Sequence, residues 1–385
     1  MSPDLLIDAL PALRAAGRLG LPTAEGLAAL PEGVFRRIGE ATARVAGEDF
    51  TGAIAALDGL DGVPAALHGA VALILGEALL GQGRLGEVER VLDERVLDER
   101  AARDPDDLDC AILRGRLRFR QGKTEEATAL LLAALAIKDH PEAHLGLGVL
   151  ALSTGRLHEA EDHLRAAIAL EPIDPRPWRA LLYRDRMAGE VARGIERAEA
   201  SAKERDLVWS DLRLLLELAE LYAAAGSTER LRSLLGSIQR IAQVGPGQAV
   251  ELARLWSEVG EIAAVEGLVA VGGPQVAGLL ADLRRDLPGA RAAWAEAARL
   301  PGVWLPHERL GAIALSTEGP AAAQPHLDEA RRRAPGAADV LLLGAAVAAA
   351  KGERQGRDRL AAAAEHPGLR ASLRARARRW SAAFG

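Results

Sequence analysis

Aromatic side chains are scarce in this sequence, and β-branched ones are not enriched. Phe, Trp and Tyr make up 3% of the 385 residues, while hydrophobic residues reach 49%, mainly through alanine and leucine. Sheets are enriched in β-branched and aromatic residues, so the composition argues against a sheet protein. It favours an all-α chain in which small residues lie at close helix contacts.

Cysteine occurs once, and long apolar runs are absent. A single cysteine excludes an internal disulfide, so nothing points to an oxidising compartment. Asp4 and Asp8 lie where a signal peptide needs a basic start and then unbroken apolar residues. No run of about 18 uncharged apolar residues is present, so no membrane-spanning helix is predicted. We expect a cytoplasmic protein.

Lysine is almost absent, and arginine supplies nearly all of the 48 basic residues. This bias is typical of a GC-rich bacterial genome. The formal net charge is -6. A chain of this length suggests two or three globular domains, unless it is built of repeats whose core grows by addition.

Residues 141–174 carry the clearest pattern. The spacing predicts one helix from Ala143 to about Thr154, a break at Gly155, and a second helix from about Leu157 to Leu170. The same pattern occurs 33 residues earlier. There Gly115, Gly122, Ala127, Leu131 and Ala134 correspond to Gly148, Gly155, Ala160, Leu164 and Ala167. Such self-similarity is typical of stacked helical hairpins, since one hairpin cannot bury its apolar face alone.

The pattern resembles the tetratricopeptide repeat, a helix–turn–helix unit of about 34 residues. Six of the nine family positions match in residues 141–174: Leu147, Gly148, Gly155, Ala160, Ala167 and Pro172. The three aromatic positions hold His144, Ala151 and Leu164 instead.

The resemblance implies an all-α, right-handed α-solenoid of about nine or ten stacked hairpins. We expect capping helices at residues 1–33, a repeat solenoid at 34–367 that is clearest at 108–174, and a basic capping helix at 368–385. The implied function is that of a non-catalytic scaffold or adaptor.

The histidines do not form a predicted metal site. His158 and His163 are five residues apart, which places their rings about 140° apart around a helix, whereas zinc-binding pairs lie three or four apart. We interpret both as part of a solvated helix face. His144 is expected to be a packed histidine, and His68, His307, His326 and His366 are scattered.

No catalytic or cofactor motif is present. The glycine-rich stretch at 269–275 lacks the lysine and the spacing of a phosphate loop, and no GxSxG occurs. We therefore expect no enzyme activity, no cofactor and no metal.

The resemblance also implies that the first helix of each repeat lines a concave groove. In residues 108–215 this groove would combine an apolar strip with six arginines, so the expected partner is a protein or peptide, with an acidic peptide favoured by the guanidinium groups. The predicted contact residues are Arg116, Phe119, Arg120, Leu145, Val149, Leu152, Arg176, Arg179, Tyr183, Arg186 and Arg213. The alternative is that these arginines are solvated or paired within the chain.

The C-terminal stretch has five arginines and no acidic residue after Gly368. Leu369, Leu373, Trp380 and Phe384 fall on one helical stripe, which favours a cap on the last repeat. An interfacial helix that binds an anionic membrane or nucleic acid is the weaker alternative. A further alternative for the whole chain is a structural subunit of a bacterial assembly, held by its convex face and ends.

Overall fold

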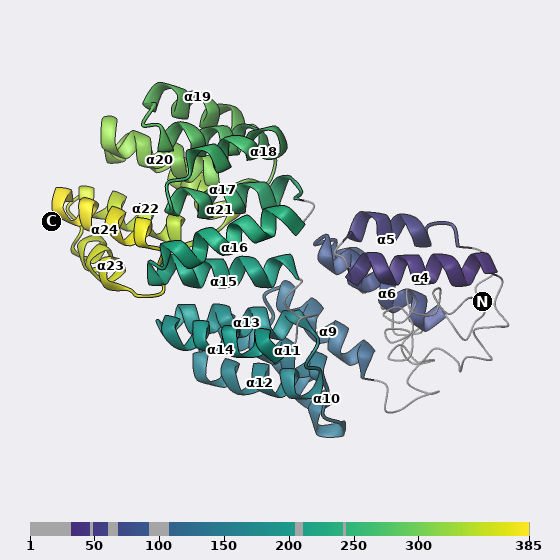
Figure 1. The fold of residues 1–385 in the computed structure, drawn as a ribbon. Coiled ribbons are helices and arrows are strands. Elements are labelled where there is room, and N and C mark those ends of the chain that lie inside the picture. The colour runs from purple at the N-terminus through teal and green to yellow at the C-terminus, as the bar shows by residue number, and fades with distance from the viewer. Residues whose placement is uncertain are drawn as a thin grey trace. The chain divides into compact units, whose positions relative to one another are not determined.

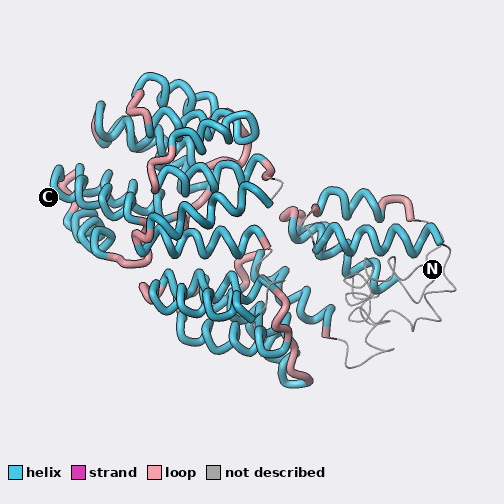
Figure 2. Tube along the Cα trace, in the orientation of Figure 1, coloured by secondary structure: helices cyan, strands magenta, loops and turns pink. Residues whose placement is uncertain are grey.

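The protein is described by a computed structural model that covers residues 32–46, 49–60, 68–91, 108–204, 211–241 and 244–384. Within these ranges it has 20 helices and no strand (Figures 1 and 2). The prediction of an all-α solenoid of stacked hairpins is confirmed. The predicted capping helices at 1–33 lie almost wholly outside the described residues.

The chain divides into an N-terminal unit, Met1–Pro172, and a C-terminal unit, Ile173–Gly385. In the N-terminal unit consecutive helices pack as hairpins. These are α4 (Glu32–Ala46) with α5 (Phe50–Leu57), α6 (His68–Gly81) with α7 (Leu85–Val91), α9 (Asp109–Arg120) with α10 (Thr124–Ile137), and α11 (Pro141–Ser153) with α12 (Leu157–Leu170).

The C-terminal unit continues the same arrangement and ends in an unpaired helix, α24 (Ala371–Phe384). Its other helices are α13 (Pro175–Met187), α14 (Val191–Glu204), α15 (Leu212–Ala225), α16 (Thr228–Ile241), α17 (Pro246–Glu258), α18 (Ile262–Leu283), α19 (Leu287–Ala297), α20 (Leu305–Thr317), α21 (Pro320–Arg333), α22 (Ala338–Ala350) and α23 (Arg354–Glu365). Helix α18 is two helices of consecutive repeats, because Gly273 has φ 60° and ψ -143° and Pro274 follows it.

The hairpin seams explain the glycines that lie inside helices. A Cβ added to Gly148 would lie 2.7 Å from Cγ of Leu164, so only glycine lets α11 approach α12 this closely. Gly155 ends the first helix with φ 73°, a left-handed conformation that L side chains rarely adopt. Asp174 accepts a hydrogen bond from the Arg176 amide and Pro175 stands at the first position of α13, so a side-chain cap and a proline begin this helix.

Helix α18 is the one described helix long and apolar enough to cross a membrane by length and composition. The break at Gly273 divides it, and each half packs in a separate hairpin. Its length therefore results from two repeats that run together.

Candidate protein-interaction surface

The predicted contact residues are shared between the two units. Six of them lie on α9 and α11 of the N-terminal unit, and four lie on α13 of the C-terminal unit, with Arg213 on α15.

In the N-terminal unit the apolar residues form a strip on two helices that pack together, α9 and α11. Val149 is 36% exposed, and Leu145, Leu152 and Phe119 are partly buried. Leu145, Val149 and Leu152 follow the i, i+4, i+7 spacing that places side chains on one helix face. This strip, named here the α9–α11 strip, remains open to solvent in its unit.

Two arginines flank the α9–α11 strip. Arg116 forms an ion pair with Glu77 of α6, so its charge is already neutralised. Arg120 is exposed and has no ion pair with any described residue. Of this pair, Arg120 is therefore the one available to an external carboxylate.

In the C-terminal unit, Tyr183 and Met187 are exposed, and a charged side chain lies beside the Tyr183 ring. Tyr183 is 37% exposed and Met187 45% exposed. The Arg186 guanidinium lies 5.2 Å from the centroid of the Tyr183 ring and donates to Glu217 at 2.9 Å. Burial raises the pKa of Glu217, and Arg186 opposes this effect.

The remaining predicted arginines of this unit differ in their surroundings. Arg176 turns back to the carboxylate of Asp174, with Nη2 2.7 Å from Oδ2. Arg213 is exposed at the start of α15. Arg179 is partly buried and forms no ion pair among the residues that the structure describes. The idea that these arginines are paired within the chain thus holds for Arg116, Arg176 and Arg186.

The inner side of the C-terminal unit is closed by the chain's own last segment, residues 366–384. Helix α24 packs against α22, α23 and α15 (Figure 1). Leu373 and Ala377 are buried, and Leu369, Trp380 and Phe384 pack against the same core. The predicted stripe is thus a packing surface.

Arg370, just before α24, connects three helices. Its guanidinium lies 3.5 Å from Glu220 of α15, 3.3 Å from Glu258 of α17 and 3.2 Å from Asp339 of α22. The side chain is only 6% exposed. Burial opposes the charge, but the three carboxylates raise the pKa of Arg370 above its ordinary value.

Asp339 is the centre of this closure. Arg254 of α17 and Arg376 of α24 each donate to it at 2.8 Å, in addition to Arg370. Burial alone would raise the pKa of Asp339, but these arginines together hold it well below its ordinary value. We call Arg254, Arg370, Arg376, Glu220, Glu258, Glu308 and Asp339 the closure network.

Sequence reasoning missed the closure network. Its acids lie on four different helices, and the hydrogen bonds between Arg370 and Glu258 and between Arg254 and Asp339 span 112 and 85 residues. No local spacing relates such residues. The arginine-rich C-terminus is visible in the sequence, but the carboxylates that these arginines bind cannot be identified from it.

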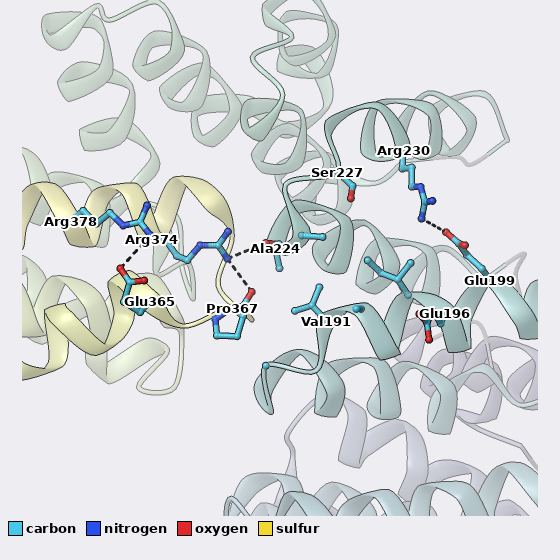
Figure 3. A pocket seen from close by; sticks show the side chains of 14 residues that line it. Val191, Glu196, Glu199, Ala224, Ser227, Arg230, Glu365, Pro367, Arg374 and Arg378 are labelled. Carbon is cyan, nitrogen blue, oxygen red and sulfur yellow. Dashed lines mark hydrogen bonds and ion pairs between the residues drawn. The ribbon is translucent and has the colours of Figure 1, made fainter.

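A hollow of about 730 Å³ lies between α14, the turn from α15 to α16, and the turn from α23 to α24 (Figure 3). The arginines that line it already have partners. Arg230 donates to Glu199, Arg378 to Glu365, and Arg374 to the backbone oxygens of Ala224 and Pro367 (Figure 3). The hollow therefore presents little unused charge to a ligand.

Four of the histidines form two pairs, which corrects the interpretation from the sequence. His158 is exposed as expected, but His163 is partly buried, and its Nδ1 lies 2.9 Å from Nδ1 of His144. His307 and His326, expected to be scattered, lie 6.5 Å apart between ring centroids. The shared interval between the members of each pair was a signal in the sequence. Within the described residues no group of three metal-ligating side chains exists.

Residues 118–182 match the tetratricopeptide repeat family. No curated protein matches the chain. A chain of the APC/C hetero-tetramer Cut9–Hcn1 is similar with a TM-score of 0.52 and 14% identity, over 86% of this chain and 58% of that chain. At this identity the likeness shows the fold.

Two further solved structures are similar over smaller parts of this chain. A tetratricopeptide repeat protein from Parabacteroides merdae shares 16% identity over 66% of this chain and all of its own, with a TM-score of 0.41. PilF from Pseudomonas aeruginosa shares 17% identity over 63% of this chain and 99% of its own, with a TM-score of 0.39.

Proposed function

We propose that this chain, a tetratricopeptide-repeat protein, is a non-catalytic cytoplasmic scaffold that binds a partner protein or peptide through the first helices of its repeats. The observation that carries the proposal is the α9–α11 strip. Val149 is exposed, and Leu145, Leu152 and Phe119 are partly exposed, on two helices that pack together. Exposed apolar side chains grouped on neighbouring elements are typical of interaction sites.

The partner is a peptide segment with apolar side chains and at least one carboxylate. Its apolar side chains pack on Leu145, Val149 and Leu152, and its carboxylate reaches Arg120 beside Phe119. Within the C-terminal unit, Tyr183 and Met187 offer a separate contact, with Arg179 as the cation. Arg116, Arg176 and Arg186 contribute less, because their own carboxylates already bind them.

Affinity capture with matched variants tests the strip. Val149→Glu places a charge in the strip, and we expect recovery of the partner to fall about tenfold or more, as for loss of a central apolar anchor. Leu132→Glu is the control, since Leu132 is 49% exposed on the second helix α10. The proposal is contradicted if proteins recovered by wild type are recovered equally by Val149→Glu.

Charge variants test the carboxylate. Arg120→Glu and Arg179→Glu should each weaken capture severalfold, and binding should weaken as salt rises, because exposed charges are screened. Arg186→Glu is unsuitable, since it would leave Glu217 beside a second carboxylate in a buried place. If both charge variants capture the partner as well as wild type does, the partner does not bind through a carboxylate.

A structural subunit of a larger assembly is the second candidate. Leu132, Ile137 and Leu170 are 49%, 58% and 42% exposed on the second helices of two neighbouring hairpins. These side chains would pack on another subunit by the convex face. The variants above separate the candidates: loss in Leu132→Glu with retention in Val149→Glu favours the subunit.

Anionic membrane or nucleic-acid binding through the C-terminus has lost its main support. Arg370 and Arg376 bind carboxylates, Arg378 binds Glu365, and Arg374 binds backbone oxygens. Of the five arginines, Arg379 alone forms no hydrogen bond or ion pair with the described residues. Binding to anionic vesicles or duplex DNA is expected to be absent at about 150 mM salt.

A further inference from the structure

Two repeats, one in each unit, carry a histidine on both helices at the same two places. His144 and His163 face each other across α11 and α12 with ring centroids 5.2 Å apart, and His307 and His326 face each other across α20 and α21 at 6.5 Å. The members of each pair are 19 residues apart, and each pair flanks a seam glycine, Gly148 or Gly311. The same placement of two titratable side chains therefore occurs in two separate hairpins.

The first pair has a defined hydrogen-bond order. Nε2 of His144 lies 2.7 Å from Oδ1 of Asp139, and the carboxylate accepts that proton. Nδ1 of neutral His144 is therefore an acceptor, and Nδ1 of His163 donates to it at 2.9 Å. The pair can hold one additional proton, on Nε2 of His163. A second proton on Nδ1 of His144 would direct two N–H groups at each other and break the contact.

Burial is the main reason why the first pair favours the state with few protons. Burial lowers the pKa of His163, and His144 across the seam lowers it further. Arg156 acts in the same direction, whereas Glu159 and Asp162 on α12 oppose it. The net effect is a lowered pKa for His163, so folding of this hairpin disfavours its proton.

Burial also disfavours protons on the second pair. Nε2 of His307 is buried and has no hydrogen-bond partner among the described residues. Burial lowers the pKa of His307, and Arg333, His326 and Arg332 add to the effect, while Glu329 opposes it.

His326 also has a lowered pKa because of burial, opposed by Glu318. Cβ of His326 is 3.3 Å from the place of a Cβ on Gly311, so the pair lies in a tight seam.

A shared metal ion does not fit the first pair. Two imidazole nitrogens that bind one tetrahedral zinc at about 2.0–2.1 Å lie roughly 3.3–3.4 Å apart. The observed separation of 2.9 Å is that of a hydrogen bond.

We propose that the α11–α12 and α20–α21 hairpins are acid-sensitive joints, which loosen when both histidines of a pair become protonated. The opened hairpin binds more protons than the closed one. The closed hairpin is therefore fully stable above about pH 6.5, and its stability is lost as the pH falls below that value. Because α11 also carries Leu145, Val149 and Leu152, opening would alter the α9–α11 strip. That last consequence rests on the proposed function, but the joints themselves do not.

Hydrogen exchange of the full chain tests the joints without a partner. After correction for intrinsic rates, wild-type amides of α11, α12, α20 and α21 should exchange about tenfold faster at about pH 5.5 than at pH 7.5, while those of α15 and α16 should not. Equal behaviour of all hairpins in wild type would overturn the proposal.

Single variants assign the effect to each pair. His163→Gln still donates to His144 but does not titrate, so it should abolish the acid response of α11 and α12 and leave that of α20 and α21. His326→Gln should do the reverse. His158→Gln, an exposed position on α12, is the control and should keep both responses. A response of α11 and α12 that persists in His163→Gln contradicts the proposal.

Ring titrations in wild type keep the test valid if a variant does not fold. By NMR, the histidines of each pair should not take up both protons before local opening is detected. Two protons bound per closed pair at about pH 5.5 would overturn the inference.

Discussion

The two units hold their repeats together in different ways. In the described part of the N-terminal unit the ion pairs are largely local and exposed, such as Arg156–Glu159 and Arg84–Glu87, and the apolar seams provide the packing. The C-terminal unit has the same seams, and the closure network in addition. That network links α15, α17, α20 and α22 to the last segment of the chain.

The difference concerns cooperativity. In an open stack each repeat contacts only its neighbours, so stability is a sum of local terms. Contacts from the C-terminal segment to α15 and α17 connect repeats that are distant in the chain. Global unfolding of the C-terminal unit should therefore be more cooperative than that of the N-terminal unit, where only neighbouring repeats are in contact.

Removal of the central charge should have the largest effect. Asp339→Asn leaves Arg254, Arg370 and Arg376 without their shared carboxylate, and breaking a buried pair costs about 3–5 kcal/mol. When urea unfolding is followed by hydrogen exchange, this substitution should shift the unfolding transition of α22 to lower urea concentration and leave that of α11 unchanged.

The matched control for this charge is an exposed pair in the same unit. Glu266→Gln removes the partner of Arg284, and both side chains are about half exposed, so the cost should stay under about 1 kcal/mol. Equal effects of the two substitutions would contradict the closure network.

Acid should reproduce part of that loss. The pKa of Asp339 is lower in the folded chain than the ordinary value of about 3.9, so the unfolded chain binds more protons. Its contribution is complete above about pH 5 and declines as the pH falls through the folded value. Wild type should lose stability more steeply between about pH 4.5 and 2.5 than Asp339→Asn does. Parallel pH profiles would show that Asp339 does not carry this dependence.

The seams of the N-terminal unit give the next effect. Gly148→Ala places a Cβ 2.7 Å from Cγ of Leu164, and overpacking of about 1–3 kcal/mol exceeds the gain of about 1 kcal/mol in helix propensity. We expect a net loss of up to about 2 kcal/mol in the unfolding free energy of α11 and α12, measured by hydrogen exchange. Gly39→Ala, a helical glycine with nothing within 4 Å, should stabilise α4 instead.

The smallest effect concerns a turn of the C-terminal unit. Arg285 has φ 58° at a repeat turn where other repeats have glycine, for example Gly155 and Gly260. Arg285→Gly should stabilise the unit by about 0.5–1 kcal/mol, since the left-handed region costs a residue other than glycine about 1–2 kcal/mol. Gly155→Ala is the mirror substitution and should destabilise α11–α12. A loss of stability in Arg285→Gly would indicate that the arginine side chain stabilises the turn.

The repeat positions predicted much of the candidate surface, but they did not predict which of its arginines are paired within the chain. The positions of Val149 and Tyr183 on first helices and their exposure agree with the expectation from the pattern. The pairing of Arg116 with Glu77 and of Arg186 with Glu217 depends on neighbouring repeats, 39 and 31 residues away. The histidine contact across the α11–α12 seam also depends on how two helices face each other.

The sequence by itself determined the helical hairpin. Gly148, Gly155, Ala160 and Leu164 act within one repeat, where helix periodicity, turn conformation and close packing are local properties. Only the tertiary structure decided that Arg370 and Asp339 meet. The number of repeats and their curvature set which distant helices face one another, and burial of charge then makes that contact depend on a matching carboxylate.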